Sequence, residues 1–407
     1  MKQSYSRCLL AISILISSAA ANSILAQNFT PRDNAVAAPP DGHGAGTLNI
    51  GGIPVNLYTG AASPVIPICE LPGRSLSASV SLAYTAGNGV QVTSVASEVG
   101  TGWALNAGGS IVCEVKGKAD EIETNPKTWL NTLYNRTAEP DMTTAQQNIC
   151  AGNDTEYDIY HLSAMGLQAD FVITGTQAQP DVRVLNNQTL TIAPGYAGRY
   201  INSFTITDAY GTRYLFMSDD QTRVQTETKL VRNGTVSAKE DYTYTSAWHL
   251  RSIDDTKGDR INLNYSAAAS SNVVYKSFSH ETYAYTNCDA YGQNCTAYTI
   301  AANLENRYET TTTVSTFAPY KISSISSAAG RIEFSRGLQN RRDAPGENSL
   351  DKISIFDPYN RLISTYLFTY GYFGASSGTT RDDVRLRLDK ITQKNAGCWA
   401  NSTAFQY

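Results

Sequence analysis

Alternation of apolar and polar residues dominates the first half of the chain. Between Ser75 and Tyr84 the sequence reads SLSASVSLAY, which places every leucine, valine and tyrosine on one face and every serine on the other. A period of two over this length predicts a half-buried antiparallel strand. Shorter alternating stretches at 48–60, 89–100 and 109–117 predict further strands that are joined as hairpins.

One segment departs from the period of two. The run WLNTLY spaces its large apolar residues as a helix does, and it predicts a short helical insertion near 125–150. Alternation then resumes at 156–174, where a hairpin is expected to turn near Gly166. The fold class predicted for the chain is therefore all-β, an array of antiparallel hairpins interrupted by one short helical insertion.

The second half repeats one unit at irregular intervals. Each copy is an alternating strand, a four-residue turn and a second alternating strand, as in FTITDAYGTRYLF at 204–216. In three copies an aspartate that can cap the turn precedes a Gly or Asn where the backbone needs a positive φ. These turn residues are Asp208, Gly211, Asp255, Gly258, Asp357 and Asn360, and Gly330 takes the glycine position in a fourth copy. The unit predicts β-hairpins, and its irregular spacing does not support a propeller.

The run EVGTGWALNAGGSI, at 98–111, combines four glycines with a tryptophan. A phosphate-binding loop would continue into a helix or carry a GK[ST] triplet, whereas this run continues as an alternating strand. Glycines allow a strand to bend or another backbone to come close, and an indole fills the space beneath. The predicted structural corner consists of Gly100, Gly102, Trp103, Gly108 and Gly109.

The chain divides into four predicted regions. A basic start followed by CLLAISILISSAA predicts a signal peptide at 1–26, with an N-terminal membrane anchor as the alternative. A Pro/Gly/Ala-rich linker is predicted at 27–47. A first β domain at 48–200 would contain the corner. Hairpin repeats at 201–407 would carry a Tyr-rich insertion at about 266–315.

Composition and charge narrow the partner classes. The 407 residues include 17% charged residues and 25 tyrosines, and the formal net charge is −4. Such a chain has no basic field to attract nucleic acid or acidic lipid. A signal peptide followed by no further long apolar stretch predicts a secreted or cell-surface protein without a membrane span after signal cleavage.

Six of the seven cysteines would remain after signal cleavage, and six cysteines allow fifteen disulfide connectivities. Only one pair can be read from the sequence: Cys288 and Cys295 bracket a Gly-containing turn and predict a local bridge. Paired ligands with zinc spacing do not occur, and no metal site or cofactor is predicted. His43 lies in the predicted linker, and His161 and His249 are interpreted as packed strand residues.

A resemblance to a known family extends over nearly the whole predicted mature chain. The run from 53 to 121, with SLAYTAGNGVQVTSVASEVGTGWALNAGGSIVCEVKGKADE at its end, resembles the N-terminal region of bacterial (Bacteroidetes-type) Rhs/YD-repeat proteins. The shell proteins of toxin complexes, components B and C, carry a similar GxGWxL segment. FDPYNRL at 356–362 is similar to the YDxxGRL repeat. The sequence departs from the pattern where Cys113 and Glu114 replace an Arg-containing step.

The resemblance implies a structural role. Family members wrap hairpins into a β-shell that encases or displays a C-terminal effector, and the partner would be that downstream part of the same protein. No catalytic residues are predicted, and toxin activity is not carried over. The alternative is an extracellular glycan- or protein-binding module that uses Tyr283, Tyr285 and Tyr291 in the Tyr-rich insertion. A polysaccharide-active enzyme is the weakest hypothesis, because nothing in the sequence nominates a carboxylate pair.

Overall fold

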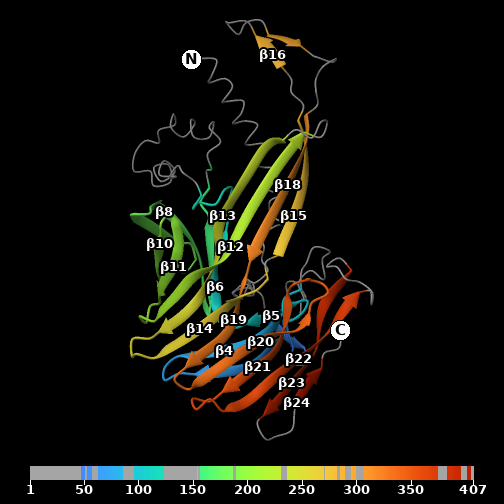
Figure 1. The fold of residues 1–407 in the computed structure, drawn as a ribbon. Helices are drawn as coiled ribbons and strands as arrows, with labels where there is room; N and C mark the ends of the chain where they lie inside the picture. The colour runs from blue at the N-terminus through green and yellow to red at the C-terminus, as the bar shows by residue number, and fades with distance from the viewer. Residues whose placement is uncertain are drawn as a thin grey trace. The chain divides into compact units, whose positions relative to one another are not determined.

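The structure is a computed structural model, shown in Figure 1. It describes residues 47–50, 53–56, 63–85, 96–122, 154, 156–186, 189–230, 236–269, 271–281, 285–288, 295–298, 307–374, 383–395 and 401–404. Every regular element among these residues is a β-strand, and every pairing between strands is antiparallel. The all-β fold class predicted from the alternation is confirmed, whereas the predicted helical insertion near 125–150 lies outside the described residues.

The strands are numbered in chain order. Their bounds are β1 Thr47–Ile50, β2 Ile53–Asn56, β3 Val65–Pro72, β4 Ser77–Tyr84, β5 Trp103–Asn106, β6 Gly109–Glu114, β7 Ile159–Ala164, β8 Leu167–Thr176, β9 Gln179–Val184, β10 Thr191–Ala197, β11 Tyr200–Thr207, β12 Arg213–Leu230, β13 Val236–Asp254, β14 Arg260–Ala267, β15 Ser271–Glu281, β16 Tyr285–Cys288, β17 Cys295–Tyr298, β18 Arg307–Ala318, β19 Tyr320–Ser327, β20 Gly330–Asn340, β21 Asn348–Phe356, β22 Leu362–Gly374, β23 Val384–Asn395 and β24 Asn401–Ala404.

The chain forms two compact units. The first contains Met1–Asp220, Thr245–Ala269 and Pro319–Tyr407, and the second contains Gln221–Tyr244 and Ser270–Ala318. Both long strands, β12 and β13, contribute residues to each unit.

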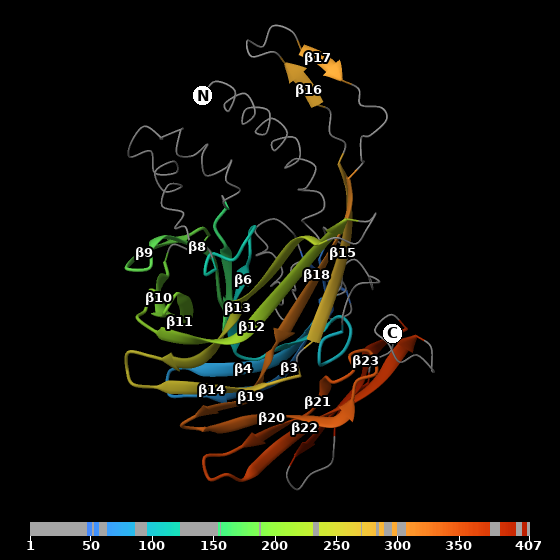
Figure 2. The ribbon, with the colours of Figure 1, turned by 45° about the horizontal axis from the view of Figure 1, so that its top comes forward.

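A long hydrogen-bonded ladder forms most of the first unit. It runs from β9 through β8, β7 and β6 to β13, and then from β13 to β14 and β19. From β19 each strand pairs with the next in the chain up to β24. Figure 2 shows these successive hairpins as the colour passes from orange to red. Neighbouring strands are mostly neighbours in sequence because each recurrent turn reverses the chain directly.

A separate three-stranded sheet, β3-β4-β5, contains the most strictly alternating segment. Ala78, Val80 and Leu82 are almost completely buried along β4, and the serines between them face outward or lie half-buried. The predicted strand at 75–84 therefore forms with the predicted face inward. Its last residue, Tyr84, pairs with Trp103 at the start of β5.

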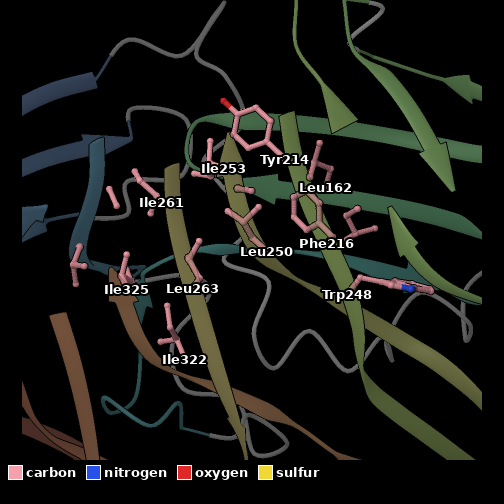
Figure 3. Close-up of a cluster of buried hydrophobic side chains, with 14 of the residues drawn as sticks. Leu162, Tyr214, Phe216, Trp248, Leu250, Ile253, Ile261, Leu263, Ile322 and Ile325 are labelled. Carbon is pink, nitrogen blue, oxygen red and sulfur yellow. The ribbon is translucent and has the colours of Figure 1, made fainter. Parts of the chain in front are cut away.

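Aromatic side chains fill one end of the core of the first unit. Trp248 is fully buried, and its Nε1 donates a hydrogen bond of 2.8 Å to the carbonyl of Ile201. The ring of Phe204 meets the indole edge-to-face at a centroid distance of 5.0 Å, and Tyr160 lies 5.7 Å from the same indole. Figure 3 shows how this end continues into a band of leucines and isoleucines from β13, β14 and β19.

The second unit is a sheet of long strands. In it, β18 pairs with β12 on one side and with β15 on the other. Threonine hydroxyls face each other across the β12–β18 pair, 3.2 Å apart for Thr226 and Thr313 and 2.9 Å apart for Thr228 and Thr311. No described residue of this unit belongs to the main hydrophobic cluster. Cross-strand polar pairs such as these contribute to the stability of a sheet.

Candidate structural site: the glycine corner and the recurrent turns

The corner predicted around Trp103 is a tight reversal that begins at Ser97. The N–H of Gly100 donates to the carbonyl of Ser97 at 3.1 Å, and the N–H of Trp103 donates to the carbonyl of Gly100 at 3.2 Å. The Ser97 hydroxyl also donates to the carbonyl of Trp103 at 2.6 Å and accepts the N–H of Val99 at 3.1 Å. One serine side chain thus connects both arms of the reversal.

Two glycines of the corner have a backbone conformation that residues with a side chain rarely adopt. Gly100 has a φ of 106° and Gly102 a φ of 78°. A Cβ at Gly100 would lie 2.9 Å from the main-chain nitrogen of Leu388, and a Cβ at Gly102 would lie 2.5 Å from Cε2 of Tyr84. Both positions therefore require glycine for conformation and for space.

The indole of Trp103 lies beneath this reversal. It is 5% exposed, and its ring centroid lies 5.0 Å from that of Tyr84. After β5 the chain reverses again through Gly108, which has a φ of 84°. Gly109 pairs with Ala164, where an added Cβ would collide with the alanine side chain. Gly100 and Gly102 thus lie in the reversal before β5, Gly108 lies in the reversal after it, and Trp103 and Gly109 are the first residues of β5 and β6.

Thr101 attaches the tip of the corner to β23. Its N–H and its hydroxyl both donate to the carbonyl of Leu386, each at 2.8 Å. The N–H groups of Gly100, Thr101 and Trp103 are therefore all donated to main-chain carbonyls. A phosphate cradle needs such groups free and convergent, so these three N–H groups are not available to a phosphate.

A buried ion pair beside the corner was not identified from the sequence. The guanidinium of Arg336 donates from Nε and Nη2 to the two oxygens of Glu98, each at 2.8 Å. The side chain of Glu98 is 10% exposed and that of Arg336 is 14% exposed. Burial would raise the pKa of Glu98, but the neighbouring Arg336 outweighs burial and lowers it. No sequence signal indicated this pair, because 238 residues separate its members.

A second buried arginine supports the same segment. Arg341 binds Asp343 through Nε at 3.1 Å and Nη2 at 2.9 Å, and its Nη2 also donates to the carbonyl of Ala96 at 2.7 Å. Asp343 accepts the N–H of Leu386 at 3.0 Å. Desolvation would lower the pKa of Arg341, but the paired Asp343 raises it above its ordinary value. The residues before the corner are thus fixed by charged groups on the loop between β20 and β21.

Three of the predicted hairpin turns share one hydrogen-bond pattern. In each, Oδ1 of the first aspartate accepts the N–H groups two and four residues later, at 2.8 and 2.9 Å for Asp208, 2.8 and 2.8 Å for Asp255, and 2.9 and 2.8 Å for Asp357. The residue three positions later has a positive φ, 84° at Gly211, 83° at Gly258 and 64° at Asn360. The carboxylate therefore closes the turn while the Gly or Asn supplies the left-handed step.

The turn before Gly330 differs from the other three. Gly330 is the first residue of β20, pairs with Ser327 and has a φ of 146°. Ser327, instead of an aspartate, accepts the N–H of Ala329 on its hydroxyl at 3.1 Å. A side chain at Gly330 would collide with the carbonyl of Phe356 on the neighbouring strand.

One turn also captures a distant loop. Oδ2 of Asp259 accepts the N–H groups of Arg74, Ser75 and Leu76 at 2.6, 2.9 and 3.1 Å. The hydroxyl of Ser75 donates to Asp255 in the same turn. The N–H donors of Ser75 and Leu76, chiefly, hold the pKa of Asp259 below its ordinary value. This turn therefore anchors the β3–β4 hairpin as well as closing its own.

Only some of the residues predicted for binding and for the disulfide are among the described residues. Tyr283 and Tyr291 lie outside the described residues. Tyr285 pairs with Tyr298, and Cys288 pairs with Cys295, in the short β16–β17 ladder. The binding role and the bridge both stay predictions. Cys69 and Cys113 are free thiols, and burial raises the pKa of Cys69 to about 12.

A groove of about 400 Å³ lies between β9 and β10. Its lining consists of proline, valine, leucine, isoleucine, alanine and one threonine, which offer no acid, base or nucleophile of ordinary catalytic strength. Within the described ranges, no group of three or more His, Cys, Asp or Glu side chains could hold a metal ion. No helix in that part of the chain is long and apolar enough to cross a bilayer.

Among the comparisons with known proteins, only the comparison with solved structures finds similar chains. No protein-family model matches the chain, and no curated protein matches its sequence. It is similar to TcdB2-TccC3-Cdc42, at 12% identity and a TM-score of 0.42, over 82% of this chain and 15% of that chain. It is also similar to the Photorhabdus luminescens Tc holotoxin pore carrying TccC3-D651A, over 90% of this chain and 16% of that chain. A third similar structure is TcdB2-TccC3-TEV, over 88% of this chain and 16% of that chain. Both have 12% identity and a TM-score of 0.42. The chain thus spans about one sixth of their length, and likenesses at this TM-score do not assign a family.

Proposed function

We propose that this chain is a secreted, non-catalytic structural segment of an Rhs/YD-repeat protein. It would form the start of a β-shell that encases or displays an effector located elsewhere. The proposal extends the sequence resemblance described above, in which FDPYNRL at 356–362 is similar to the YD repeat.

The recurrent turn is the observation that carries the proposal. Asp208, Asp255 and Asp357 close three separate hairpins with the same hydrogen bonds, and these hairpins belong to antiparallel ladders. A ladder built this way grows by adding one hairpin at its edge, as repeat architectures do. A shell wall requires that kind of growth, whereas a catalytic centre requires converging reactive groups.

The corner supports the same role. Through Thr101 and Glu98 it joins the N-terminal strands to β23 and β20, over sequence separations of 285 and 238 residues. Such ties attach the segment before β5 to the main ladder. The proposed regions are the signal peptide at 1–26, the linker at 27–47, the β domain at 48–200 and the repeats at 201–407.

Co-expression with the polypeptide encoded immediately downstream tests the function. We expect the two products to copurify as a stable complex, or as one continuous protein, in which the downstream portion resists added protease. The Glu98→Gln variant, which destabilises the corner, should lower that protection, and the matched control Arg223→Gln, which removes an exposed pair with Asp241, should leave it unchanged. A downstream product that neither binds nor gains protection would contradict the shell role.

Secretion is tested separately. Expression in a bacterium with a signal peptidase should yield a shortened protein outside the cytoplasm, with a new N-terminus at or before residue 27. Full-length protein retained in the cytoplasm or membrane would contradict export without affecting the shell role.

A further inference from the structure

His161 on β7 lies between two carboxylates from its neighbouring strands. Its Nδ1 is 2.6 Å from Oδ1 of Asp170 on β8, and its Nε2 is 2.9 Å from Oε2 of Glu114 on β6. Asp170 is directly opposite His161 in the β7–β8 register. The ring therefore bridges three adjacent strands on the face opposite the core residues Tyr160 and Leu162.

The donors and acceptors of the two carboxylates and the imidazole restrict the protonation state of the ring. An ionised carboxylate can only accept a hydrogen bond, so each ring nitrogen must donate. A neutral imidazole carries one N–H, and only the imidazolium carries two. Glu114 is ionised across the neutral range. Burial would raise its pKa, but hydrogen bonds from Lys116 and His161 outweigh burial and lower the pKa.

We propose that His161 is a protonation-sensitive clamp on β6, β7 and β8. As an imidazolium it holds both carboxylates; when it gives its proton to solvent, one of the two hydrogen bonds is lost. The inference does not rest on the proposed function, although in a shell it would make the stiffness of this wall depend on pH.

The surroundings of the ring indicate which bond is lost. The charged groups around it are Glu114 and Lys116 from β6 and the loop that follows it, and Asp170 from β8. Val112, directly opposite on β6, is apolar. Glu114 keeps a partner without the histidine, because Nζ of Lys116 donates to its Oε1 at 2.8 Å.

Asp170 is held more firmly to its own neighbourhood. It exchanges two hydrogen bonds with Asn186, one from its N–H at 2.8 Å and one to its Oδ2 at 2.9 Å, and its contact with Nδ1 is the shorter of the two. The ring should therefore keep Nδ1–H on Asp170 and lose the proton from Nε2. Glu114 is then released to Lys116, and the tie between β6 and β7 weakens.

Histidine ring NMR on the full chain tests the clamp directly. Imidazole side chains ordinarily change charge between pH 5 and 8, so spectra of ¹⁵N-histidine protein are recorded from pH 5.5 to 8.5. We expect both nitrogens of His161 to carry protons at the acid end and Nδ1 alone to carry one at the alkaline end. His249, which contacts a single carboxylate through Nε2, serves as the reference in the same spectra.

Hydrogen exchange of residues 159–164 supplies the structural readout. After correction for the intrinsic effect of pH, exchange should be about two- to fivefold faster at pH 8 than at pH 6, as expected for a partly exposed charged pair. The His161→Gln variant keeps a polar side chain without the titration and should lose this pH response. Asp170→Asn and Glu114→Gln should each lose most of it.

Three outcomes would overturn the proposal. If the ring stays neutral down to pH 5.5, it cannot donate to both carboxylates. If it stays doubly protonated at pH 8.5, neither hydrogen bond is lost. Retention of the proton on Nε2 instead of Nδ1 would reverse the assignment of the released bond. These readings come from the unmodified protein, so they hold even if a variant fails to fold.

Discussion

Glu98 and Arg336 form a bidentate, nearly buried ion pair that joins the segment before the corner to strand β20. The main chain adds a third tie at the same place, because the carbonyl of Glu98 accepts the N–H of Leu350 at 3.0 Å. The pair therefore lies where the segment before the corner meets two adjacent strands, β20 and β21, in which Arg336 and Leu350 are directly paired.

Loss of the Glu98 carboxylate should destabilise the first unit strongly. Glu98→Gln leaves the guanidinium of Arg336 buried without its counter-charge, and breaking such a pair costs about 3–5 kcal/mol. Urea unfolding followed by tryptophan fluorescence measures the loss. The control is Arg223→Gln, which removes an exposed pair with Asp241 and should leave the midpoint almost unchanged. Equal effects of the two changes would contradict the importance given to the corner.

Side chains should be tolerated unequally at glycines of similar φ. Gly100→Ala adds a collision with the main chain of Leu388 to the cost of its positive φ, whereas Gly166→Ala, at a φ of 85°, meets nothing within 4 Å. We expect about 1–2 kcal/mol for the open position and clearly more for Gly100. Thermal unfolding of the two variants compares them. Matching losses would show that the close approach of Leu388 has no energetic weight.

The anchor of the β3–β4 hairpin should weaken in acid. The folded protein lowers the pKa of Asp259, so its stabilisation is present above the unfolded value of about 3.9 and is lost as pH falls through the lower folded value. Exchange of the N–H groups of Arg74, Ser75 and Leu76 should therefore rise below about pH 4. Asp259→Asn, which still accepts hydrogen bonds but carries no charge, should show little of this dependence. An anchor equally protected at pH 3 and pH 6 would contradict the role of the carboxylate.

Cys288 and Cys295 should form a disulfide in protein from an oxidising compartment. They are directly opposite in β16–β17, and opposed residues of an antiparallel pair have Cα atoms about 4.5–5.5 Å apart, within the range that disulfides span. Peptide mapping without reduction should recover the two halves of this hairpin as one linked species. Cys288→Ser should abolish it, and recovery of both cysteines as alkylated thiols would refute the bridge.

Local features were the most predictable from the sequence. The alternation from Ser75 to Tyr84 predicted β4 and its buried face because side chains on a strand point to opposite faces in turn. The turns at Asp208, Asp255 and Asp357 could be read because capping aspartate and left-handed residue lie within four positions of each other. In both cases the determining contacts span only a few residues.

The partners of the corner could not be predicted. Gly100 and Gly102 showed that something approaches closely, but Leu388 and Tyr84 are identified only once the strands are placed. Asp259 shows the same limit: its sequence marks a turn, and its second role, toward Ser75, depends on a contact 184 residues away. Contacts of this kind follow from strand order, which a repeated hairpin unit leaves open.

The tie between Thr101 and the carbonyl of Leu386 sets an order of events during synthesis. At about 5–20 residues per second, the ribosome needs about 15–60 s to make the 285 residues between them. Throughout that interval the N–H and hydroxyl of Thr101 lack the carbonyl of Leu386 that they bind in the folded protein. Docking of the corner is therefore one of the last steps in the folding of the first unit.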